Sequence, residues 1–103
     1  MKPAVFQAVA DDVYLENERQ DAKWGEQNPP DGTGGPFWQA MSAEVRMSCD
    51  RAFGDGFGTW RHILAEEVYE AFAEEDPAKL RAELIQVAAV AMQWVAALDR
   101  RRK

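Results

Sequence analysis

Apolar residues recur at helical spacing in four segments of the chain, and no segment shows sustained alternation of apolar and polar positions. The first segment runs from about Pro3 to Trp24, and its second half is mostly polar. Apolar residues three and four positions apart are typical of an amphipathic helix, whereas alternation would indicate a strand. This segment is therefore expected to be a helix with an apolar face made of Val5, Phe6, Val9, Val13 and Tyr14.

Three further helices are predicted at about Phe37–Phe53, Trp60–Glu75 and Pro77–Arg100. Thr59 and Asp76 are suitable N-caps for the last two, because their side-chain oxygens can accept a hydrogen bond from the first helical turn. The segments between the helices contain glycine and proline, which interrupt regular structure. The chain is therefore predicted to be all-α, a single domain over residues 1–103 that forms a four- to five-helix bundle.

Two glutamates fall inside the apolar faces of the last two predicted helices. At about 100° per residue, Glu67 projects into the apolar face of the third helix and Glu83 into that of the fourth. Glu70 and Gln86 follow three residues later, at the margins of these faces. A carboxylate on a core-facing surface is costly unless it is paired or bound to a cation. The apolar faces comprise Trp60, Ile63, Leu64, Val68 and Ala71, and then Leu80, Leu84, Val87, Ala91, Trp94 and Leu98.

A short connection should make the last two helices antiparallel neighbours. Glu67 and Glu70 would then face Glu83 and Gln86 across one seam. Three carboxylates and an amide oxygen this close would repel one another without a cation. Mg²⁺ prefers oxygen ligands and usually bridges carboxylates and phosphate oxygens. The sequence therefore predicts a site for Mg²⁺, with Mn²⁺ as the alternative ion, and a phosphate-bearing substrate.

Composition and charge narrow the classes of partner. The 103 residues are 47% hydrophobic and carry a net charge of -6, although the last four residues are all basic. An acidic body disfavours a nucleic-acid polymer as partner. Cys49 is the single cysteine, so no disulfide framework is expected and a reducing cytoplasm is the default. The uncharged run Leu84–Leu98 is shorter than the roughly 20 residues of a membrane span, so no membrane association is expected.

The segment Thr59–Ala71, with the sequence TWRHILAEEVYEA, resembles the first metal-binding helix of MazG-like nucleotide pyrophosphohydrolases. These belong to the all-α NTP pyrophosphatase superfamily. The family pattern is ExxE on one helix and ExxD on the next. Here ExxE is Glu67–Glu70, and the second half is Glu83–Gln86, with glutamine in place of the aspartate. This resemblance covers about residues 59–99, and Glu18–Asn28 also resembles small MazG-like proteins that come mostly from phages and prophages.

The resemblance implies hydrolysis of a nucleoside triphosphate between its α and β phosphates, which yields a monophosphate and pyrophosphate. It also implies Mg²⁺ and a homodimer or a dimer of dimers. Glu67, Glu70 and Glu83 would be the metal ligands, and Gln86 would offer a neutral oxygen or act through a water. Glu66 is then the best candidate to position or deprotonate the attacking water, a role that suits a nearby carboxylate.

A triphosphate also needs cationic and stacking partners from the protein. Arg19, Lys23 and Arg61 are the basic residues expected nearest to the cleft, and arginine suits bidentate contact with phosphate. Trp24 and Trp60 are candidates to stack on a base, with ordinary packing as the alternative. Asn28 is a candidate to contact the base or sugar, although asparagine also shapes turns.

The sequence is also consistent with two alternatives to NTP hydrolysis, and it predicts that the chain associates with copies of itself. Arg61 or Arg81 could instead pair with the two embedded glutamates, which would leave a non-enzymatic acidic interaction protein. A third alternative is a pyrophosphohydrolase of another phosphorylated nucleotide, such as phosphoribosyl-ATP. The last helix is apolar almost all round from Leu84 to Met92, which predicts a homo-oligomer independently of the resemblance.

Overall fold

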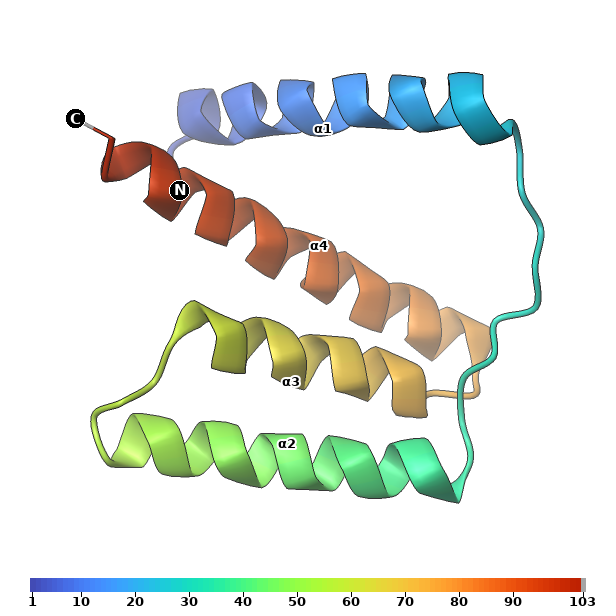
Figure 1. Cartoon of the computed structure of the whole chain (residues 1–103), viewed down its shortest axis with the longest axis vertical. Helices are drawn as coiled ribbons and strands as arrows, with labels where there is room; N and C mark the ends of the chain where they lie inside the picture. The colour runs from blue at the N-terminus through green and yellow to red at the C-terminus, as the bar shows by residue number, and fades with distance from the viewer. Residues whose placement is uncertain (103) are drawn as a thin grey trace. The chain divides into compact units, whose positions relative to one another are not determined.

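The computed structural model describes residues 1–102, which form four α-helices and no strand. The helices are α1 (Pro3–Trp24), α2 (Pro36–Gly54), α3 (Trp60–Ala73) and α4 (Pro77–Arg100) (Figure 1). The predicted all-α class and bundle-like helix contacts are therefore confirmed, with four helices rather than five in the described range. Each boundary lies within about two residues of the one expected from the sequence.

Side-chain caps begin α3 and α4 where the sequence predicts them. The Thr59 hydroxyl accepts a hydrogen bond from the backbone N–H of His62 at 3.3 Å. The Asp76 carboxylate accepts one from the backbone N–H of Lys79 at 3.0 Å. Because a cap pairs a backbone donor that the helix cannot satisfy, these two residues fix the starting points of the helices that carry the glutamates.

The chain divides into two compact units. Met1–Asp31 groups with the end of α4 from Met92 onward, and Gly32–Ala91 forms the second unit. The second unit therefore contains α2, α3 and the first part of α4, and it carries all three predicted glutamate ligands.

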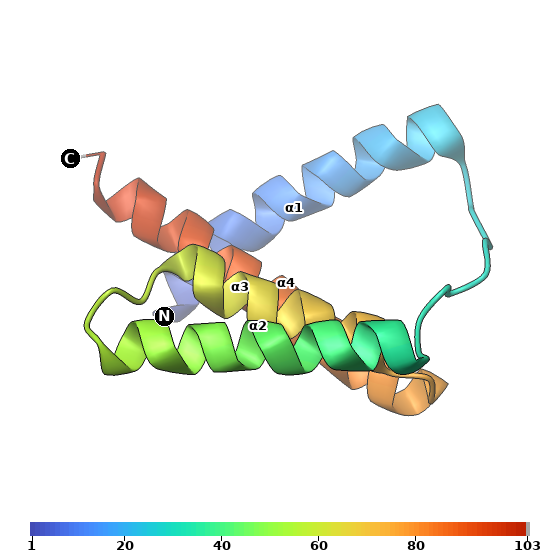
Figure 2. The same cartoon turned by 60° about the horizontal axis from the view of Figure 1, so that its bottom comes forward.

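In the second unit, α2 packs antiparallel against α3 (Figures 1 and 2). Trp38 of α2 anchors this contact, with ring centroids 5.0 Å from Phe72 and 6.1 Å from Tyr69 on α3. These separations are in the range of favourable aromatic pairs. Cys49, about three turns further along α2, is buried. The expected α2 face is confirmed, because Trp38, Met41, Val45 and Cys49 are all buried or half-buried.

The glycine-containing loop before α2 is fastened to the end of α3. The backbone N–H of Gly34 donates to the carbonyl of Phe72 at 2.7 Å, and the N–H of Gly35 donates to the Glu75 carboxylate at 3.0 Å. Gly34 has a φ of 89°, and a Cβ there would collide with the Glu75 side chain. Glycine is therefore required at position 34 both by backbone conformation and by space.

In the first unit, burial is confined to a narrow strip. Val9 is 2% exposed and Ala96 is fully buried, whereas most of the expected apolar face of α1 is exposed. The predicted helix is therefore confirmed, but its apolar face is mostly uncovered in the single chain. Within this unit only the last turns of α4 are available to cover α1, and they carry small alanines at the buried positions. The exposed residues of the expected α1 face are Val5, Phe6, Val13 and Tyr14.

The α4 face is also covered less than predicted. Leu80, Val87, Ala91 and Trp94 are buried or half-buried, but Leu84 is 51% and Leu98 is 45% exposed. By length and composition alone, α4 is apolar enough to cross a membrane. Core helices that are mostly buried have the same length and composition, whereas 11% of this window is buried here.

Candidate metal centre

Three glutamates from two helices converge in the second unit. Glu67 and Glu70 lie on successive turns of α3, and Glu83 lies in the second turn of α4. Each offers one carboxylate oxygen, and these three oxygens all lie within 4.8 Å of one another. The predicted convergence of these residues is confirmed. They form an acidic group that could hold a metal ion, and we call it the glutamate triad.

Two oxygens of the triad are buried without a partner in the described part of the chain. Oε2 of Glu67 and Oε2 of Glu83 accept no hydrogen bond from it. Burial raises the pKa of both carboxyls, and the negative charge of Glu70 raises both pKa values further. A buried acceptor without a donor is costly, and either a proton or a cation would relieve it. The donor set consists of hard oxygen ligands, which fits Mg²⁺ or Mn²⁺.

One basic residue of α2 contacts the edge of this group. Nη2 of Arg46 donates to Oε1 of Glu70 at 2.8 Å, and Nε of Arg46 lies 3.8 Å from Oε1 of Glu66. The spacing along α3 and α4 could not identify Arg46, because it lies 24 residues from Glu70 and reaches it only when α2 packs on α3. In the described residues no ion pair joins Arg61 or Arg81 to the triad.

Glu66 is directed toward α2. Besides its ion pair with Arg46, it lies beside the buried thiol of Cys49, whose pKa is raised to about 11 by burial and then by the Glu66 carboxylate. Glu66 precedes Glu67 in the chain and is half-buried, with 24% of its side chain exposed. Its assignment as the residue that activates water stays a prediction.

The other predicted residues of the second unit lie on the same helices. Gln86 is exposed on α4, one turn after Glu83. Trp60 is half-buried and Arg61 is exposed, both in the first turn of α3. Glu67 lies about two turns further along α3. Their roles as a metal ligand, a stacking residue and a phosphate contact stay predictions.

The remaining predicted substrate residues belong to the first unit, whereas the triad belongs to the second. Arg19 pairs with Glu16 at 2.9 Å, and Asn28 is exposed. Nζ of Lys23 lies 4.8 Å from the ring centroid of Trp24, which is a cation–π distance. Trp24 is 59% exposed, so it does not serve as a core residue in the single chain.

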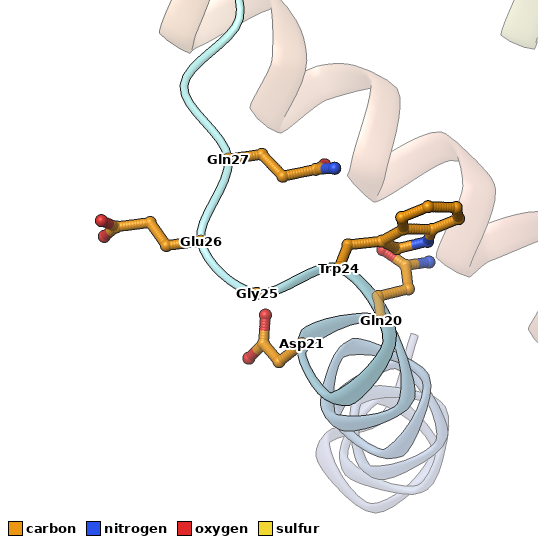
Figure 3. A pocket seen from close by; sticks show the side chains of 6 residues that line it. All are labelled: Gln20, Asp21, Trp24, Gly25, Glu26 and Gln27. Atoms are coloured by element: carbon orange, nitrogen blue, oxygen red, sulfur yellow. The ribbon is translucent and has the colours of Figure 1, made fainter.

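Trp24 also lines an open cavity of about 540 Å³ at the end of α1. Figure 3 shows the Trp24 ring beside Gln20, with the Gln27 amide on the same side, whereas Glu26 points away. A planar ring next to amide groups offers one stacking surface and several hydrogen-bond donors and acceptors. The sequence identified Trp24 but not its neighbours, because ordinary polar residues in a turn carry no distinctive spacing. The cavity is lined by Gln20, Asp21, Trp24, Gly25, Glu26 and Gln27.

Comparison with known proteins adds no assignment: no protein-family model, no curated protein and no solved structure matches the chain.

Proposed function

We propose that this protein is a Mg²⁺-dependent nucleoside triphosphate pyrophosphohydrolase that cleaves a ribo- or deoxyribonucleotide to its monophosphate and pyrophosphate. The observation that carries the proposal is the glutamate triad, in which two partnerless buried oxygens and three close carboxylates fit a hard divalent cation. The resemblance of residues 59–99 to MazG-like enzymes supplies the reaction. Mn²⁺ is expected to substitute for Mg²⁺.

The acidic residues of α3 and α4 have two proposed roles, which are to bind the metal ion and to accept a proton from the attacking water. Glu67, Glu70 and Glu83 hold the cation, and the amide oxygen of Gln86 adds a neutral ligand directly or through a water. A bound Mg²⁺ neutralises phosphate charge and orients the phosphate chain, which is most of what phosphoryl transfer requires. Glu66 accepts the proton of the attacking water.

The other residues of the proposal bind the nucleotide. In the second unit, Arg61 neutralises phosphate oxygens and Trp60 stacks on the base, and in the first unit Arg19, Lys23 and Trp24 stay separate candidates for phosphate and base contacts. Asn28 contacts the base or the sugar. The proposed location is the cytoplasm, where nucleotides and Mg²⁺ are both abundant.

We also propose that the active form is a homodimer or homotetramer that uses α4. Leu84 and Ile85 are neighbours on α4 and are 51% and 56% exposed. Large apolar side chains that are exposed together on one helix are typical of a protein interface. A second copy of the chain is the partner with a matching apolar surface. Burial of this surface between copies would account for an apolar helix that the single chain leaves uncovered.

The test is hydrolysis of a panel of NTPs and dNTPs with Mg²⁺, with separate assays for pyrophosphate and orthophosphate. We expect pyrophosphate and the monophosphate in equal amounts from at least one nucleotide. Glu67→Gln should abolish this activity, whereas Glu44→Gln on the exposed side of α2 should retain it. Absence of cleavage across the panel would contradict the enzyme proposal and favour an acidic interaction protein. Phosphoribosyl-ATP is included as the alternative substrate.

A further inference from the structure

Arg46 is the cation that contacts the glutamate triad in the described chain. Its guanidinium donates to Glu70 at 2.8 Å and lies 3.8 Å from Glu66. The two side chains differ in exposure: 58% of the Arg46 side chain is exposed, whereas 19% of the Glu70 side chain is exposed. The carboxylate is therefore held in place by the fold, whereas the arginine reaches it from solvent.

A metal ion in the triad would change this contact. Glu70 offers an oxygen to the ion, and the same carboxylate accepts the hydrogen bond from Arg46. A divalent cation and a guanidinium on one carboxylate repel each other. An exposed ion pair contributes little to stability, so the ion can displace Arg46 at small cost. The long side chain of Arg46 can then move while its stem stays on α2.

We propose that Arg46 is an exchangeable counter-ion, which neutralises Glu70 and Glu66 in the metal-free protein and binds a substrate phosphate once a metal ion occupies the triad. This inference rests on the proposed function, because it requires both the metal and a phosphate-bearing substrate. Arginine suits this exchange, because its planar guanidinium fits carboxylate and phosphate oxygens with the same geometry. Arg46 is thus a substrate-positioning residue contributed by α2.

The first arm of the test measures metal binding without any nucleotide. Mn²⁺ is titrated into the wild-type protein, Arg46→Gln and the control Arg51→Gln, and free Mn²⁺ is measured by electron paramagnetic resonance. Arg51 lies on the same helix, is exposed and forms no ion pair within residues 1–102. We expect Arg46→Gln to bind Mn²⁺ about two- to fivefold more tightly, which corresponds to loss of one exposed ion pair. Arg51→Gln should bind Mn²⁺ as the wild type does.

The second arm measures phosphate binding with the ion present. Inorganic tripolyphosphate, which has a phosphate chain but no base, is titrated calorimetrically in excess Mg²⁺. Arg46→Gln should bind it about tenfold more weakly, because a charge-assisted hydrogen bond is lost. Arg46→Lys keeps the charge and should restore Mn²⁺ affinity to the wild-type value, but it should recover only part of the tripolyphosphate affinity.

An arginine that only ties α2 to α3 would give a different result. Arg46→Gln would then lower the melting temperature but leave Mn²⁺ and tripolyphosphate affinities unchanged, and this outcome overturns the inference. Equal effects of Arg46→Gln and Arg51→Gln would also overturn it, because they would reflect net charge alone. Neither arm uses turnover, so a protein that cleaves no nucleotide but shows both shifts would contradict the proposed reaction and still support the exchange.

Discussion

Glu67 and Glu83 lie on different helices, yet each contributes an oxygen to a group whose members are within 4.8 Å of one another. In each of these two carboxylates, Oε2 is buried without a hydrogen-bond partner in the described chain. Two carboxylates this close are stable only when a proton or a cation reduces their repulsion.

Replacing Glu83 with glutamine should stabilise the metal-free protein and remove its response to Mg²⁺. The amide keeps the shape of the side chain but removes one charge from the triad. At neutral pH with EDTA, we expect the melting temperature to rise by roughly 2–5 °C. Ten-fold excess of Mg²⁺ over its dissociation constant should stabilise the wild type by about 1.4 kcal/mol and the variant by much less. Differential scanning fluorimetry measures both effects, and an equal response of the two proteins to Mg²⁺ would count against the triad.

The contribution of Glu67 and Glu83 to the stability of the metal-free protein should fall as the pH rises. The pKa values of Glu67 and Glu83 are raised above 4.5 in the folded protein. As the pH rises above about 4.5, these groups ionise first in the unfolded chain, which favours unfolding. Their contribution to the free energy of unfolding therefore falls until the pH passes the raised pKa values of the folded state, and then stays low.

The measurement is urea denaturation between pH 4.5 and 8 in EDTA, for the wild type and for the double variant Glu67→Gln/Glu83→Gln. The difference in unfolding free energy isolates the two groups from other carboxyls. We expect the wild type to lose stability relative to the double variant as the pH rises, and Mg²⁺ should reduce that loss. A difference that does not vary with pH would show that the two carboxyls ionise normally.

Helix positions and caps could be predicted from the sequence because they depend on local features. Thr59 and Asp76 each cap a helix through a backbone N–H only three residues away. The approach of Glu83 to Glu67 could also be predicted, because the short connection between Ala73 and Pro77 keeps the start of α4 close to the end of α3. The contact of Arg46 with Glu70 could not, since it depends on the rotation of α2 about its axis against α3.

The exposure of apolar residues was the least predictable feature. Val13 and Leu84 each occupy a helical position that the spacing assigns to a core face, but both are about half exposed. Spacing shows that a face is apolar, but it does not show whether the same chain or another copy covers that face. The prediction of a homo-oligomer depends on this distinction.

Removing the cap of α4 should destabilise the protein moderately. Asp76→Ala deletes the carboxylate that accepts from the N–H of Lys79, while the helix sequence stays unchanged. We expect a loss of about 1 kcal/mol of unfolding free energy, and Asp76→Asn should recover most of it. Chemical denaturation of both variants checks this. Equal loss in the two variants would mean that the charge, rather than the cap hydrogen bond, is the important feature.

A charge on the exposed face of α4 should change the oligomeric state. Ile85 is 56% exposed and neighbours Leu84 on the surface that we assign to a second copy. Sedimentation equilibrium should show a dimer or tetramer for the wild type and a smaller species for Ile85→Asp. Phe57→Asp is the matched control, because Phe57 is 77% exposed in the loop between α2 and α3. A monomeric wild type would contradict the proposed assembly.

The central claim is that Glu67, Glu70 and Glu83 together bind a divalent cation. Equilibrium titration with Mn²⁺, followed by electron paramagnetic resonance, tests it most directly in the wild type, in Glu67→Gln and in the surface control Glu44→Gln. We predict saturable binding of Mn²⁺ in the wild type and the control, competition by Mg²⁺, and at least tenfold weaker binding in Glu67→Gln. Equal Mn²⁺ affinity in all three proteins would contradict the claim.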